Sequence, residues 1–245
     1  MINALLLLPL LGLDIAPQLA HDEPPPPYVS QGSYRTLSCS LSLAPDQLVI
    51  SGGSSIEGVR PTEVAAQLDR QKAAIQRYLQ GLKGSLVEKE HLRAARNVDD
   101  VKSGKQPYIH LMRFEALLPV GANADQAIEG LIKLGMDRYG KDANIDDYSQ
   151  YKVLSSYRAT AAKSRITAAR EQCLQEQVQA CNKESGGKCK QRFELTASQF
   201  EARGVVNSEN RYFDDAGLQR LDNLDAASAA PVQVLMRLTV HVGNK

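Results

Sequence analysis

Four cysteines are the residues of this sequence with the clearest capacity for chemistry. They are Cys39, Cys173, Cys181 and Cys189. An even number of cysteines favours disulfides over free thiols in an exported chain, and the N-terminal residues predict export here. Zinc sites usually show closely spaced ligand pairs such as C-x-x-C or H-x-x-x-H, and this sequence has neither pattern. We therefore expect two disulfides and no metal site.

The spacing of the cysteines predicts how they pair. Cys173 and Cys181 fall in one long predicted helix, about 12 Å apart along its axis, which exceeds the Cα separation that a disulfide tolerates. Cys181 comes just before the reversal at Gly186-Gly187 and Cys189 just after it, so the returning chain brings these two together. Cys39 is then left for Cys173. The sequence predicts a short-range disulfide, Cys181–Cys189, and a long-range disulfide, Cys39–Cys173.

The remaining polar residues match no catalytic or cofactor-binding pattern. A hairpin turning near Lys102 would put His91 and His110 on opposite faces of its sheet, whereas a one-residue slip of register would put them on the same face. Residues 149–152 fit a Ser-x-x-Lys pattern, but the companion motifs of that enzyme class are absent. Neither glycine pair precedes the Lys-Ser or Lys-Thr of a phosphate-binding loop. We expect no enzymatic activity, no catalytic residue and no cofactor.

Alternating apolar and polar residues predict the strands that position the cysteines. The clearest segments of this kind are 34–43, 108–119 and 232–242. Cys39 lies on the apolar face of the first, and His110 lies on the core face of the second. A further strand begins at Leu48, and we expect it to end in a flexible stretch at 51–55.

Helical spacing of apolar residues predicts three amphipathic helices. Their expected ranges are 61–82, from Asn123 or Ala124 to near Gly140, and 158–184. Less regular strands are expected at 86–98, 151–157 and 193–197, and 199–230 reads as irregular apart from a short helix near Leu218 and Leu221. Strands interleaved with helices predict an α+β fold, with an antiparallel or mixed sheet and about three helices packed mainly on one face.

The N-terminal region reads as a leader followed by a spacer. Residues 4–13 are almost all apolar, a run with the length of a signal-peptide core and too short to span a bilayer. Small residues follow, and then four successive prolines at 24–27, which favour an extended conformation. We expect a signal peptide over 1–20, a spacer over 21–32, a single domain over 33–245 and no transmembrane span in the mature chain. A buried N-terminal helix is the alternative.

The overall charge argues against one class of partner. The chain has 29 basic and 28 acidic residues and a formal net charge of +1. Proteins that bind nucleic acids present a basic field to the phosphates, and none is evident here. We expect no nucleic-acid partner.

The order of elements and several residues resemble a known family. The segment 48–53 (Leu-Val-Ile-Ser-Gly-Gly) is followed by a helix opening at 61–66 (Pro-Thr-Glu-Val-Ala-Ala), a hairpin and a second helix, and Tyr157-Arg158-Ala159 then leads into a long helix rich in alanine and charge. This layout resembles the SIMPL domain family over about 33–242. Cys173 and Cys181 depart from its usual alanine-rich helix, and the stretch 199–230 is longer than the family's.

The resemblance implies a function without supplying a mechanism. It implies a protein of the periplasm, or one associated there with the outer membrane, that forms a homo-oligomer or binds a partner protein of the cell envelope. It also implies no enzymatic activity and, as in some members, a link to stress tolerance. The alternatives are a periplasmic redox or hydrolytic enzyme and a small-ligand carrier.

Overall fold

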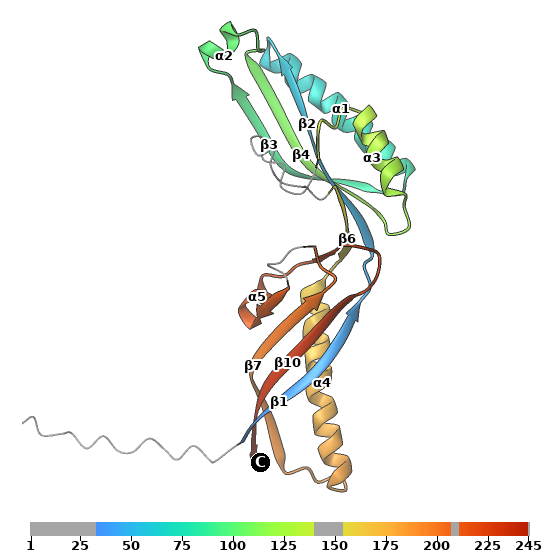
Figure 1. The fold of residues 1–245 in the computed structure, drawn as a ribbon, viewed down its shortest axis with the longest axis vertical. Coiled ribbons are helices and arrows are strands. Elements are labelled where there is room, and N and C mark those ends of the chain that lie inside the picture. Colours follow the sequence, from blue (N-terminus) through green and yellow to red (C-terminus); the bar gives the residue numbers. More distant parts are fainter. Residues whose placement is uncertain (1–32, 140–153, 207–210, 245) are drawn as a thin grey trace, which may run out of the picture.

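The computed structural model describes residues 33–139, 154–206 and 211–244. Within them the chain forms two antiparallel sheets and five helices, which confirms the predicted α+β class. The strands form two sheets where one was expected. Figure 1 shows these sheets one above the other along the long axis, meeting where β2 (Gln47–Gly58) pairs with β6 (Ser155–Ala159). The predicted leader and spacer lie outside the described residues.

The first sheet, sheet A, contains the first and last strands of the described chain. Its order is β1-β10-β7-β8, with β1 at Ser33–Leu43, β7 at Gln191–Arg203, β8 at Tyr212–Asp214 and β10 at Val232–Asn244. Helices α4 (Ala162–Glu184) and α5 (Asp215–Gln219) pack against it. Alternate residues of β10 are buried in the core beneath α4, as its period-two pattern predicts.

The second sheet, sheet B, is formed by strands that lie between β1 and α4 in the sequence, together with β9 from the later part of the chain. Its order is β3-β4-β2-β6-β9, with β3 at Ser85–Ala95, β4 at Tyr108–Pro119 and β9 at Leu224–Ala226; the short β5 (Arg138–Tyr139) also pairs with β2. Helices α1 (Pro61–Gly81) and α3 (Ala124–Lys133) cover one face (Figure 1), and α2 (Val98–Lys102) connects β3 to β4. The predicted hairpin and the core face of 108–119 are confirmed.

Local sequence explains where the helices of sheet B begin and end. Pro61 occupies the first position of α1, where its missing N–H costs no hydrogen bond. The Asn123 side chain caps α3 by accepting a hydrogen bond from the Gln126 amide at 3.1 Å. Helix α3 ends at Lys133, before the predicted end near Gly140, because Gly135 adopts a left-handed conformation at φ 96°.

The expectation of a flexible stretch at 51–55 is wrong. Strand β2 continues through these residues to Gly58 and pairs with β4 along its whole length. Position 52 of this strand is a glycine because a Cβ there would lie 2.4 Å from the Met136 sulfur and 3.0 Å from a Phe114 ring carbon. The glycine lets these two side chains pack directly against the backbone, so it marks a close approach instead of a loop.

Two further expectations need correction in the second half of the chain. Arg158 and Ala159 belong to strand β6, and the long helix begins only at Ala162, after Ala161 turns the chain at φ 51°. The segment 199–230 is more regular than predicted, since β7 continues to Arg203 and β8, α5 and β9 follow. The short helix expected near Leu218 is present as α5, and Leu218 is fully buried.

Candidate functional site

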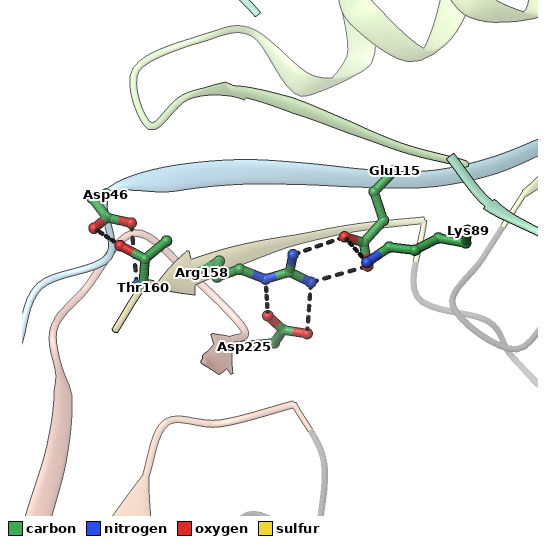
Figure 2. Close-up of polar contacts among 6 residues, drawn as sticks. All are labelled: Asp46, Lys89, Glu115, Arg158, Thr160 and Asp225. Atoms are coloured by element: carbon green, nitrogen blue, oxygen red, sulfur yellow. Dashed lines mark hydrogen bonds and ion pairs between the residues drawn. The ribbon is translucent and has the colours of Figure 1, made fainter. Parts of the chain in front are cut away.

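A network of charged side chains connects four strands of sheet B near the point where this sheet adjoins sheet A. We call Lys89, Glu115, Arg158 and Asp225 the junction network. Figure 2 shows the Arg158 guanidinium between the two carboxylates, with Lys89 approaching Glu115 from the other side. Arg158 donates to Asp225 from Nε at 2.7 Å and to Glu115 from Nη1 at 2.8 Å and Nη2 at 3.1 Å. Lys89 Nζ lies 3.1 Å from Glu115 Oε2. The guanidinium thus bridges two carboxylates from different strands.

Strand pairing explains why these residues meet. Arg158 lies opposite Asp225 in the β6–β9 pair and opposite Gln47 in the β6–β2 pair. Glu115 projects from β4 on the face away from α1 and α3, because its neighbours Phe114 and Ala116 are in the helix-covered core. Arg158 and Asp225 are buried, and the Glu115 side chain is only 13% exposed. The network therefore sits between strands that arrive from distant parts of the sequence.

A second polar contact holds the same junction. The Asp46 amide donates to the Arg158 carbonyl at 2.9 Å, and the Thr160 amide donates to Asp46 Oδ1 at 3.3 Å. The Thr160 hydroxyl also donates to Asp46 Oδ2 (Figure 2). Asp46 stands at the end of the link from β1 to β2, and Thr160 stands between β6 and α4. Two of the links that carry the chain between the sheets are thus bonded to each other.

The electrostatics of the junction network keep Glu115 and Arg158 ionised. Burial by itself would raise the pKa of Glu115, but hydrogen bonds and charge from Arg158, assisted by Lys89, outweigh it and hold that pKa below its ordinary value. Burial opposes the charge of Arg158 as well, and the two carboxylates overcome it and raise the pKa of Arg158. Groups held ionised in this way neither give nor take a proton near neutral pH. The arrangement is suited to holding the strands of sheet B together, not to acid–base catalysis.

Acidification should weaken this junction. Because the folded pKa of Glu115 is depressed, its contribution to stability is fully present above the unfolded value, about pH 4.3, and is lost as the pH falls through the folded pKa. We expect the urea midpoint to fall between about pH 5 and pH 3, and to fall less steeply in Glu115→Gln. Circular dichroism during urea titrations measures both. An unchanged slope in the variant would contradict the assignment.

The four cysteines form the two pairs that the sequence predicts. Cys39 is bonded to Cys173, which joins β1 to α4, with a Cα separation of 6.4 Å. Cys181 is bonded to Cys189 across the turn after α4, with a Cα separation of 5.4 Å. All four are in the described residues, and none is free. Two disulfides fit a protein of an oxidising compartment.

The histidines of the hairpin lie on the same face of sheet B. A bulge between Glu88 and Glu90 shifts the register by one residue, so His91 pairs with Met112 and its ring centroid lies 5.7 Å from that of His110. His110 is 4% exposed, and Arg93 Nε donates to its Nε2 at 3.5 Å. Burial first, and then the charges of Arg93 and His91, lower the pKa of His110. The pattern of alternation could not reveal the bulge.

A cleft borders this histidine at the end of sheet B far from the junction. It has a volume of about 210 Å³ and lies between the first turn of α1, the end of β3 and the start of β4. Its polar side chains include Arg93 and His110, and the other lining residues are Pro61, Val64, Ala94, Ala95, Tyr108 and Ile109. Within 33–139, 154–206 and 211–244, no group of three histidine, cysteine or acidic residues is placed to hold a metal ion. The Ser-x-x-Lys segment at 149–152 lies outside these ranges.

The geometry defines a two-sheet α+β protein with two disulfides, a buried junction network and one cleft beside a buried histidine. Comparison with protein-family models and with curated proteins finds no match to this chain. The resemblance to the SIMPL family therefore stays a prediction. Among the helices of the described residues, none is long and apolar enough to cross a membrane.

Proposed function

We propose that this chain is a non-enzymatic, SIMPL-like protein of the bacterial periplasm that assembles with copies of itself. Its two disulfides support an extracytoplasmic location, because such bonds persist in oxidising compartments. The predicted signal peptide supports export, and association with the outer membrane is the more specific expectation. The surface that carries the assembly proposal is the outer edge of β1.

Strand β1 is a long edge without the usual protection. It has 11 residues and, among the described strands, pairs only with β10. It contains no proline and no bulge, and Arg35 is its single charged residue. At the opposite end of sheet A, the three-residue β8 pairs with Gln199–Glu201, and the part of β7 before this pair carries Arg192 and Glu194. The edge strand β3 of sheet B has a bulge and several charged residues. Edges like β1 are templates for pairing with another strand.

A second copy of β1 is a suitable occupant of this edge. Antiparallel pairing of two β1 strands would be self-complementary, as a two-fold symmetric interface requires. Pairing centred on Ser38 would set Arg35 opposite Leu41 of the second copy, so like charges would not meet. The interface would extend sheet A across two chains.

Solution mass tests this proposal directly. We expect light scattering coupled to gel filtration to give a discrete oligomer for the mature protein, and Ser38→Lys with Ser40→Lys to shift it to the monomer, because lysines on an edge oppose strand addition. Both serines are exposed, so the fold should persist. The matched control is Gln233→Lys with Thr239→Lys, which adds the same charge to the same sheet on β10, a strand that is paired on both sides. A wild-type monomer, or equal dissociation by both variants, would contradict the proposal.

A further inference from the structure

The cleft beside His110 combines an apolar lining with a cation, Arg93, that has no acidic partner in the part of the chain that the structure describes. Arg93 makes one hydrogen bond in the described part of the chain, from Nε to His110, and no described carboxylate pairs with it. Its neighbours differ in this respect. Lys72 pairs with Glu88, and Arg96 pairs with Glu57. Arg93 thus lines the cleft as a positive charge that no carboxylate of the described residues neutralises.

The bond to His110 fixes the orientation of this guanidinium. Because Nε is engaged by the buried imidazole, the outer N–H groups of Nη1 and Nη2, at the far end of the guanidinium, remain for a ligand. Those nitrogens form the planar fork that binds both oxygens of a carboxylate. His110 can serve as the anchor because it stays neutral and accepts the bond, its pKa being lowered chiefly by burial.

The first turn of α1 adds to the preference for an anion. The N-cap residue Arg60 makes no side-chain hydrogen bond to the helix, so the amides at this helix end have no side-chain cap. Pro61 and Val64 of the same turn line the cleft. The positive end of the helix dipole therefore faces the same volume as Arg93.

From this arrangement we infer that the cleft binds a small monocarboxylate, with the carboxylate on the Arg93 fork and an aliphatic chain against Val64, Ala95 and Ile109. The volume of about 210 Å³ is below that of sites for drug-sized ligands, which favours a short chain. This inference is independent of assembly through β1, because the cleft lies on the other sheet.

Hexanoate is the probe that tests the inference. Titration followed by backbone amide NMR should shift the signals of residues around the cleft, and hexanol and hexylamine should shift them at least tenfold less at equal concentration. Shifts of equal size with hexanol would overturn the role of the charge, and shifts spread over the whole surface would overturn the site.

Three variants distinguish the contribution of the Arg93 charge from that of the cleft volume. Arg93→Gln should weaken hexanoate binding at least tenfold, because it removes the charged fork from an exposed side chain. Ala95→Leu should weaken it comparably by filling the cleft while keeping the charge. Arg192→Gln, an exposed arginine on sheet A, is the control and should leave binding unchanged. Unchanged binding in Arg93→Gln or in Ala95→Leu would overturn the proposal, and the amide spectrum of each variant reports its fold.

Discussion

Replacing Cys39 and Cys173 together with alanine should lower the free energy of unfolding by about 5 kcal/mol. The disulfide between them closes a loop with a sequence separation of 134, and the loss of chain entropy on closing such a loop gives about 5 kcal/mol in the unfolded-state model. Cys173 is also buried in the core of sheet A, so alanine leaves a small void there. Urea unfolding followed by circular dichroism, without reductant, measures the change.

The second disulfide supplies a matched control. Cys181–Cys189 spans a sequence separation of only 8, for which the same relation gives about 2.5 kcal/mol. The double alanine variant at these positions should therefore cost about half as much. If the short loop proved as costly as the long one, loop closure would not be the source of the stabilisation.

Replacing Arg158 with alanine should destabilise the protein by about 3–5 kcal/mol. The substitution leaves the carboxylates of Glu115 and Asp225 without their shared cation in a site where the side chains are 13% and 7% exposed. Arg203→Ala is the control, because Arg203 also pairs with a carboxylate but is 60% exposed, and we expect little change. Calorimetry compares the two.

A triple variant distinguishes a missing partner from lost packing. Arg158→Met combined with Glu115→Leu and Asp225→Leu removes all three buried charges, and apolar replacements of whole ionic clusters are often tolerated. We expect the triple variant to be more stable than Arg158→Ala alone. A greater loss in the triple variant would show that the network is strongly stabilising in itself.

The sequence predicted the elements well wherever a single periodicity governs them. The alternation of β10 and the helical spacing of α1 gave strand and helix because one face of each is buried. The cysteine pairing followed from chain geometry alone. The predicted ends of elements were wrong where tertiary packing overrides local preference. Gly52 is an example: glycine is typical of a flexible turn, but here it leaves room for Met136 against the strand.

The candidate sites were largely invisible to sequence reasoning. Arg158 stood at the start of a predicted helix, and only the pairing of β6 with β9 brings it to Asp225. The bulge near Glu90 that places Arg93 beside His110 depends on the register of two strands, which no local pattern specifies. Division into two sheets was missed for a related reason, since alternation reveals that a strand is half buried without revealing its neighbours.

The pairing of β1 with β10 has a consequence for how the chain folds. Strands β2 to β6 and helices α1 and α3 all lie between β1 and α4, so most of sheet B is complete before the last strand of sheet A is synthesised. A chain that emerges from its N-terminus first can build that part early, whereas β1 and Cys39 must wait for partners far along the sequence. Closing such long-range contacts is slow. The late step is therefore the arrival of β10, and until then β1 lacks its neighbour on both sides.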